Sequence, residues 1–341
     1  MQNLTIALDA MGGDYGPLVT IPALKQAVQE FPQVSFAVFG SSNQIMPLLS
    51  KYQLSKNPRV KFFASASVIH NDDKPITALR DRRDSSMYLA LEYVAQGLAH
   101  GCVSAGNTGA LVALSRWIIK PLAGVRRPAL VSLLPTRSGK TSVMLDLGAN
   151  PNCGADVLYQ FAVMGNVFAQ QILSRSTPKI ALLNIGQEMI KGNQVVQKAS
   201  QQLSAVQDLN YCGFVEGNRI FDGDLDVIVC DGFSGNVALK TAEGTADLVL
   251  SSIKRVVEKS FWQRWLIKLF MPRLSTHINS LKPSRHNGAV LLGLKGIVIK
   301  SHGSANEDAF FQALRQVIEY SDQQIPEKID AQIQKILAPH S

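Results

Sequence analysis

The sequence predicts a doubly wound, Rossmann-like α/β sheet with helices on both faces. Short, predominantly apolar runs alternate with stretches long enough for amphipathic helices over most of the 341 residues. Several runs end in loops rich in Gly, Asp and Asn, where an α/β sheet binds its ligands. Hydrophobic residues make up 46% of the chain and charged residues 18%, as in an ordinary globular protein. We therefore expect a single α/β unit across residues 1–341.

Nine runs are predicted to be strands because each is short and predominantly apolar. In chain order they are 4–8, 35–39, 61–64, 102–105, 130–134, 143–147, 180–185, 227–230 and 297–299. Most are separated by segments of helix length. No run approaches the roughly 18 uninterrupted apolar residues that a membrane-spanning helix needs.

Six of these strands lead into polar loops. In chain order the loops are 9–14, 104–109, 146–150, 184–186, 231–236 and 301–304. Gly lets the backbone approach a ligand closely, and helices that begin after Gly106 and Gly235 would direct N–H groups at an anion such as phosphate. We expect the six loops to converge on one crevice. Any one of them alone is equally compatible with a tight turn.

Several common catalytic motifs are missing. Residues 139–141 resemble the end of a Walker A loop, but Leu134 stands where its first Gly is required. The GxSxG nucleophile elbow fails at Asn236, and the sequence has no GxGxxG, HxxxxD or HExxH pattern. These absences disfavour a P-loop NTPase, a serine hydrolase and a zinc enzyme. We expect no metal and no cofactor.

Lys191 and His302 are the most informative single residues. Lys191 lies in a predicted strand-to-helix connection, where an ammonium would pair with phosphate or a developing oxyanion. His302 lies at a predicted strand end before a Gly and would donate to the same anion. A solvated loop lysine and a structural histidine remain open as alternatives.

The four cysteines lack CxxC or metal-binding spacing, so we expect free thiols in a reducing compartment. Cys153 has no His nearby in sequence and is expected to be a buried thiol rather than a nucleophile. The first nine residues show no secretory signal, and we expect a cytoplasmic location.

Positive charge is concentrated in residues 254–300. This segment holds ten Lys and Arg residues against one Glu, whereas the whole chain has a formal net charge of +8. The remainder of the chain is therefore nearly neutral. Such a segment indicates an acidic partner, either an anionic membrane surface or an acidic protein, since no recognised nucleic-acid-binding motif accompanies the charge.

The aromatic residues of this segment have helical spacing. Trp262, Trp265 and Leu269 share one face, and Arg264 and Lys268 lie on the other, as in a helix that lies at a membrane interface. A core or dimer-interface helix explains the same pattern equally well. We expect a protruding, basic amphipathic helical element at about 254–282.

Six ordered segments carry a family resemblance. They are 6–14, 103–111, 145–150, 183–192, 231–240 and 291–303, and the similarity extends to about residue 336. Together they resemble the bacterial acyl-ACP:phosphate acyltransferase (PlsX) family of phospholipid synthesis. Residues 286–290 depart from the more usual form of that family's turn.

The resemblance implies transfer of a long-chain acyl group from acyl carrier protein to inorganic phosphate. A membrane glycerol-3-phosphate acyltransferase would then consume the acyl phosphate. It further implies a homodimer at the inner face of the cell membrane and a fold similar to phosphotransacetylases and isocitrate-dehydrogenase-like enzymes. Lys191 and Asn236 become the catalytic candidates. The expected phosphate- and substrate-binding residues are Asp9, Gly12, Gly13, Gly106, Asn107, Thr108, Asp146, Asn150, Asp231, Gly235 and His302.

Three alternatives remain open from the sequence. A non-catalytic peripheral membrane scaffold would form no acyl phosphate. A short-chain phosphotransacetylase would prefer acetyl-CoA to long-chain acyl carrier protein. A decarboxylating dehydrogenase is compatible with the missing GxGxxG because that fold class does not use the fingerprint.

Overall fold

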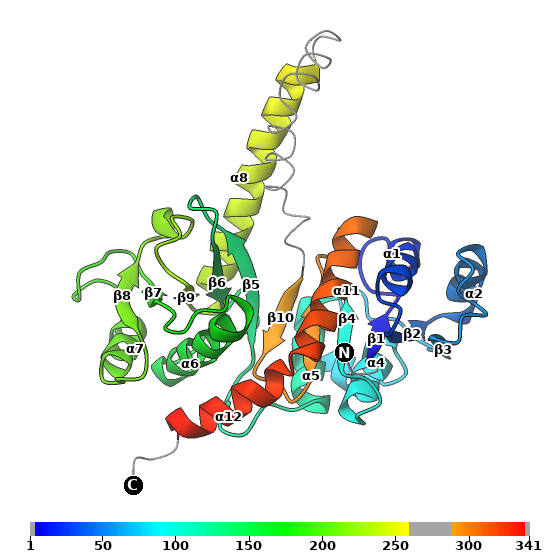
Figure 1. Ribbon diagram of the computed structural model, residues 1–341, viewed down its shortest axis with the longest axis horizontal. Helices are drawn as coiled ribbons and strands as arrows, with labels where there is room; N and C mark the ends of the chain where they lie inside the picture. The colour runs from blue at the N-terminus through cyan, green and yellow to red at the C-terminus, as the bar shows by residue number, and fades with distance from the viewer. Residues whose placement is uncertain (1–3, 259–287, 338–341) are drawn as a thin grey trace.

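The computed structural model describes residues 4–258 and 288–337. In these residues it contains one eleven-stranded sheet with the order β3-β2-β1-β4-β11-β10-β5-β6-β9-β7-β8. Helices cover both faces (Figure 1). The predicted α/β class with helices on both faces is confirmed.

All nine predicted strands are present, and two further strands are found, β8 and β10. The strands are β1 Thr5–Asp9, β2 Ser35–Gly40, β3 Val60–Ala64, β4 Gly101–Ser104, β5 Ala129–Pro135, β6 Thr141–Leu145, β7 Ile180–Leu183, β8 Tyr211–Val215, β9 Val227–Val229, β10 Ala289–Leu292 and β11 Ile297–Lys300. β8 is the edge strand opposite β3, and its residues Tyr211 to Gly213 are partly or fully exposed.

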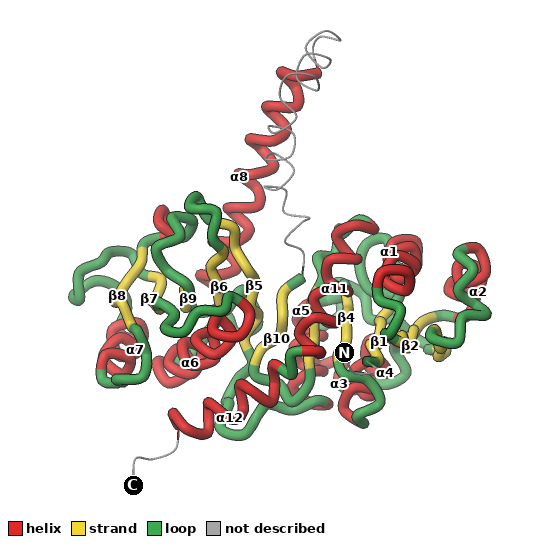
Figure 2. Tube along the Cα trace, in the orientation of Figure 1, coloured by secondary structure: helices red, strands yellow, loops and turns green. Residues whose placement is uncertain are grey.

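The helices occupy the segments between the strands. They are α1 Pro17–Glu30, α2 Ser42–Lys51, α3 Pro75–Asp81, α4 Ser86–Ala95, α5 Thr108–Ile118, α6 Ala155–Ile172, α7 Gln194–Ser204, α8 Gly232–Glu258, α11 Glu307–Asp322 and α12 Ile325–Leu337. A short 3₁₀ helix spans Gly217–Arg219. Figure 2 shows how these helices flank the central strands.

Two strands break the parallel pattern of the sheet. β10 is antiparallel to both β11 and β5, and β5 is antiparallel to β6. β6, β7 and β9 therefore run opposite to β1, β4 and β11. We call the end of the sheet where β1, β4 and β11 terminate the β4 rim, and the opposite end, where β6, β7 and β9 terminate, the β9 rim.

The reversal corrects one expectation. The six polar loops do not all meet at one end of the sheet, because three follow strands that end at the β4 rim and three follow strands that end at the β9 rim. A doubly wound sheet with all strands parallel would have brought them to one end.

Apolar side chains fill a core on each face of the sheet. β1 illustrates the division, since Ile6 and Leu8 belong to one cluster and Ala7 to the other. This alternation follows from the two-residue period of a strand. The first cluster takes side chains from α1, α6, α11 and α12, and the second from α4 and α5, with Ala238 and Leu239 of α8 packed against it.

Helix α8 connects the two rims. It begins at Gly232, directly after β9 ends at the β9 rim, and Lys240, eight residues on, contacts His302 at the β4 rim. Beyond the body of the protein the helix continues as a projection (Figure 1). Its last turn includes the start of the predicted basic element at 254–282, and Trp262, Arg264, Trp265, Lys268 and Leu269 lie outside the described residues. Among the residues that the structure describes, no helix is long and apolar enough to cross a membrane.

Candidate active site

Asp9 holds the loops of the β4 rim together. Its carboxylate is buried and accepts hydrogen bonds from the hydroxyls of Ser86 and Ser104, both at 2.6 Å. Burial raises the pKa of Asp9 above its ordinary value, and the bonds from the two serines oppose that rise. Both oxygens of the expected ligand-binding carboxylate are therefore engaged within the protein.

Glycines allow the loops after β1 and β4 to touch. A Cβ on Gly12 would lie 2.5 Å from the backbone nitrogen of Gly106, so no other residue fits without a shift. Gly13 has a φ of +92°, in the region that favours glycine. The amide of Gly106 donates to the Ser104 hydroxyl at 3.1 Å. Gly12 and Gly106 therefore allow the loops after β1 and β4 to pack closely.

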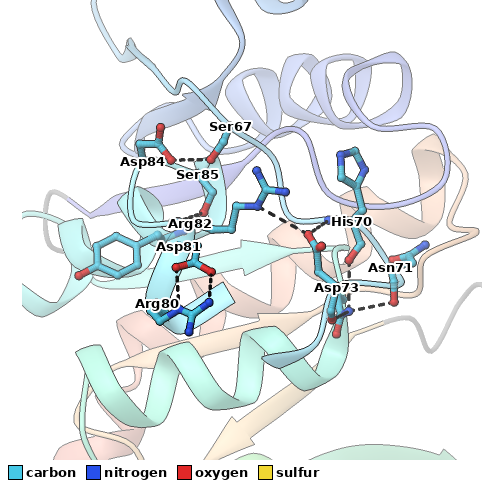
Figure 3. Close-up of polar contacts among 11 residues, drawn as sticks. Ser67, His70, Asn71, Asp73, Arg80, Asp81, Arg82, Asp84 and Ser85 are labelled. Atoms are coloured by element: carbon cyan, nitrogen blue, oxygen red, sulfur yellow. Dashed lines mark hydrogen bonds and ion pairs between the residues drawn. The ribbon is translucent and has the colours of Figure 1, made fainter. Parts of the chain in front are cut away.

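Asn107 caps α5 and fastens the neighbouring loop, of which Figure 3 labels Asn71 and Asp73. Its side-chain oxygen accepts from the amide of Ala110, and its Nδ2 donates to the carbonyls of Asn71 at 2.9 Å and Asp73 at 3.0 Å. The loop is braced further by Ser67, whose hydroxyl bonds Asp84 at 2.6 Å. Thr108 and Gly109 are the first two residues of α5, so their N–H groups have no acceptor within the helix. The Asn107 cap bonds the Ala110 amide and leaves these two N–H groups unused.

Lys240, Lys300 and His302 lie near one another at the β4 rim, and we call these three residues the cationic corner. Lys240 Nζ is 3.0 Å from His302 Nε2 and 2.7 Å from Glu243. The Lys300 ammonium donates to the carbonyls of Ala105, at 3.2 Å, and Ser301. Burial, then the charge of Lys240, lowers the pKa of Lys300 to about 8. An anion bound near Lys300 would stabilise its ammonium against burial and the charge of Lys240.

Both ring nitrogens of His302 face hydrogen-bond donors. Nε2 lies 3.0 Å from the Lys240 ammonium, and Nδ1 accepts from the Ser304 amide at 3.2 Å and lies 2.8 Å from the Ser304 hydroxyl. Burial, then Lys240, lowers the pKa of His302. The ring is therefore neutral at pH 7, and the positive charge of the corner comes from Lys240 and Lys300.

Asp146 and Asn150 build the loop of the β9 rim. Asp146 is buried and accepts from the amides of Leu130, at 2.9 Å, and Asn150, at 2.7 Å. The Asn150 side chain donates to Asp146 at 2.8 Å and to the Pro128 carbonyl at 2.7 Å. Burial raises the pKa of Asp146 against these bonds. The observed contacts of both residues hold the loop in place.

The start of α8 is set against this loop. Asp231 accepts from the amide of Ser234 at 2.9 Å and from its hydroxyl at 2.8 Å, as a helix cap does. A Cβ on Gly235 would lie 1.9 Å from the Asp146 carbonyl oxygen. The Gly235 amide donates to the carbonyl of Asp231 at 2.9 Å. Gly235 thus lets α8 seat on the loop, and its N–H is engaged within the helix.

An open pocket of about 450 Å³ lies beside the start of α8 at the β9 rim. Its lining is Pro151, Asn152, Cys153, Leu158, Asn193, Val195, Val196, Asp231, Phe233 and Ser234. Burial, then Asp231, raises the pKa of Cys153 to about 12, so the cysteine is a thiol at neutral pH. Cys153 is half-buried rather than fully buried as expected, and its raised pKa agrees with the expectation that it is not a nucleophile.

Lys191 and Asn236 are both exposed residues of the β9 rim. Lys191 lies in the loop between β7 and α7, and its carbonyl accepts from Asn184 at 3.2 Å. Asn236 lies in the second turn of α8 next to Gly148, whose added Cβ would be 3.6 Å from the Asn236 amide oxygen. Lys240 follows Asn236 by four residues, so the two side chains are neighbours on one helix face.

Lys240, Lys300 and the pocket were not predicted as site components. Lys300 ends β11 two residues before His302, so its position was the signal that could have identified it. Lys240 is brought to His302 across 62 residues of chain, which no local pattern encodes. Within residues 4–258 and 288–337, no group of His, Cys, Asp and Glu is arranged to hold a metal ion.

Comparison with known proteins shows a full-length match. The family model described as "Fatty acid synthesis protein" matches residues 4–328. Proteins named phosphate acyltransferase from Shewanella amazonensis and Vibrio parahaemolyticus are each 48% identical to the chain, over 99% of it and 98% of each relative. A third, from Vibrio campbellii, is 47% identical over the same shares.

Solved structures agree in fold. A phosphotransacetylase from Streptococcus pyogenes superposes with a TM-score of 0.63 at 19% identity, covering 95% of this chain and 94% of that one. A phosphotransacetylase from Staphylococcus aureus gives 0.57 at 16% identity, covering 96% and 94%. The predicted similarity to phosphotransacetylase folds is confirmed.

Proposed function

This chain belongs to the fatty acid synthesis protein family, and from that premise we propose that it transfers a long-chain acyl group from acyl carrier protein to inorganic phosphate. It is an acyltransferase, and acyl phosphate for phospholipid synthesis is its product. The observation that carries this function is the near-full-length match, at up to 48% identity, to proteins named phosphate acyltransferase. The cationic corner beside Asn236 supplies a place for the phosphate.

The phosphate site of this proposal is the corner formed by Lys240, Lys300 and His302. Phosphate at neutral pH is already an anionic nucleophile, so it needs positioning rather than a Ser-His-Asp relay. Lys240 and Lys300 supply the countercharge, and the N–H groups of Thr108 and Gly109 at the start of α5 add dipole donors. Gly12, Gly13 and Gly106 shape the adjoining loops, which Asp9 holds in register.

The chemical step forms one bond and breaks one. A phosphate oxygen attacks the thioester carbonyl carbon, and the tetrahedral intermediate collapses with loss of the carrier thiolate, which then takes up a proton. Asn236 and Lys191 are proposed to stabilise the developing oxyanion. Asn236 suits this role because the α8 face that carries it also carries Lys240, one turn further along. Asp146, Asn150, Asp231 and Gly235 position the start of that helix.

The acyl donor and the site of product delivery explain the basic segment. Acyl carrier protein is acidic, and residues 254–300 would steer it electrostatically. We further propose a cytoplasmic homodimer that lies on the inner face of the membrane and hands its product to a glycerol-3-phosphate acyltransferase. Replacing Trp262, Trp265 and Leu269 by Ser should abolish binding to anionic vesicles in flotation while sparing turnover in solution. Retained flotation would place this helix at the subunit interface instead.

The deciding experiment uses purified protein and palmitoyl-acyl carrier protein with and without inorganic phosphate. Release of the carrier thiol is followed, and acyl phosphate is trapped with hydroxylamine. The proposal expects phosphate-dependent release and a trapped hydroxamate. If the folded protein releases no carrier thiol, the result would favour the non-catalytic membrane scaffold. Preferential use of acetyl-CoA in competition would identify a short-chain phosphotransacetylase.

A further inference from the structure

The pocket at the β9 rim has an apolar wall that an alkyl chain could contact. Five of its ten lining residues are Pro151, Leu158, Val195, Val196 and Phe233, all apolar, and the other five are polar. Its volume of about 450 Å³ falls within the range of small-molecule sites. Asp231 is the charged residue of the lining, and a carboxylate there disfavours phosphate or another anion.

We propose that this pocket binds the methylene tail of the acyl donor. The inference rests on the proposed acyl transfer and adds the location of the chain to it. Three of the polar lining residues are engaged within the protein, since the Ser234 hydroxyl donates to Asp231 at 2.8 Å and the Asn193 side chain accepts from the Val196 amide at 2.9 Å. Burial of methylene groups against Leu158, Val196 and Phe233 then drives binding.

One wall of the pocket and two of the residues proposed for the reaction lie along the same helix. Phe233 precedes Asn236 by three residues on α8, and Asn236 precedes Lys240 by four, so the three side chains follow one another along one helix face. In this order the helix presents the alkyl pocket, the oxyanion donor and the phosphate corner. A thioester bound with its tail at Phe233 therefore has its carbonyl next to Asn236 and on the side of the phosphate.

The second wall of the pocket leads to Lys191 in the same way. Asn193, Val195 and Val196 come from the start of α7, and Lys191 lies two residues before Asn193. The loop before it exposes Ile185 and Ile190 by 80% and 83%. Large aliphatic side chains on a surface loop are costly in water unless an apolar partner covers them. A long acyl chain that exceeds the pocket has this surface to lie on.

The test is a chain-length profile. We would measure kcat/KM for palmitoyl- and butyryl-acyl carrier protein, at saturating phosphate, in wild type and in Val196→Trp, which fills the pocket. The ratio of palmitoyl to butyryl kcat/KM should fall at least about tenfold in the variant, since the tail loses its contacts. Leu98→Trp, at an exposed position before β4, is the matched control and should keep the wild-type ratio.

A second variant guards against misfolding. Phe233 is 67% exposed, so Phe233→Ser removes one wall without disturbing the core. It should weaken palmitoyl-acyl carrier protein binding in calorimetry by about tenfold and butyryl-acyl carrier protein binding far less. An unchanged ratio and unchanged binding would overturn the pocket assignment, as would equal losses for both chain lengths. If the wild type binds palmitoyl-acyl carrier protein but forms no acyl phosphate, the proposed reaction is refuted. The comparison of binding between wild type and Phe233→Ser would then still test whether the pocket holds the acyl tail.

Discussion

The lowered pKa of Lys300 predicts a measurable pH dependence of the free energy of unfolding. Its pKa is lowered from 10.5 to about 8, because its ammonium is buried and lies near Lys240. The folded state therefore binds fewer protons than the unfolded state between these two values, so the free energy of unfolding rises with pH across that window. Each unit of the shift corresponds to about 1.4 kcal/mol.

Between pH 7.5 and pH 10, Lys300 alone should add about 2 kcal/mol to the free energy of unfolding. We would measure urea unfolding at both pH values for wild type, Lys300→Met and Lys295→Met. Lys300→Met should lack this gain, whereas Lys295→Met, which removes an exposed lysine five residues earlier, should keep it. Other titrating groups contribute equally to all three proteins. The same pH dependence in wild type and Lys300→Met would refute the argument.

The same titration should appear in catalysis. If the Lys300 ammonium helps to hold phosphate, the KM for phosphate should rise as pH increases through about 8 in the wild type. Lys300→Arg keeps its charge at every accessible pH and should flatten this rise. A phosphate KM that is independent of pH from 7 to 9.5 in the wild type would argue against a role for Lys300 in the anion site.

Three other changes test separate parts of the site. Asn236→Ala and Lys191→Ala should each lower kcat at least about 100-fold, with circular dichroism unchanged, and near-wild-type turnover in both would remove the oxyanion assignment. Gly235→Ala should lower the free energy of unfolding by about 3 kcal/mol or more because its Cβ would meet the Asp146 carbonyl at 1.9 Å, whereas Gly244→Ala, with open space around it on the same helix, should raise it by about 0.5–1 kcal/mol. Cys153, with its pKa raised to about 12, should react with iodoacetamide at pH 7.5 at least about 100-fold more slowly than an unperturbed thiol, and rapid labelling in mass spectrometry would contradict the buried environment.

The nine strand predictions were all confirmed. All nine were short apolar runs, and most of them are buried on both faces of the sheet, whereas the residues of the edge strand β3 are partly or fully exposed. β8, at the edge opposite β3, was missed although four of its five residues are apolar. β10 was missed although all four of its residues are apolar.

The expected site residues were placed in the right loops, but their individual roles depended on contacts. Asp9 and Asp146 follow strands, as ligand-binding carboxylates do, yet each is occupied by donors within the protein. Those donors include Ser104, which is 95 residues from Asp9 in the chain. A carboxylate that binds a ligand and one that fastens a loop have the same local sequence, so only the partners distinguish them.

The sequence by itself determined the fold class, the positions of most strands and the family, because these depend on local apolar patterns and on ordered motifs. The tertiary structure alone decided the direction of each strand. Through the antiparallel pairing of β10 with β11 and β5, and of β5 with β6, it divided the polar loops between two rims. It also brought Lys240 to His302 through the path of α8. Strand direction and such distant contacts are set by which elements pack together, and that free energy is a property of the whole chain rather than of any segment.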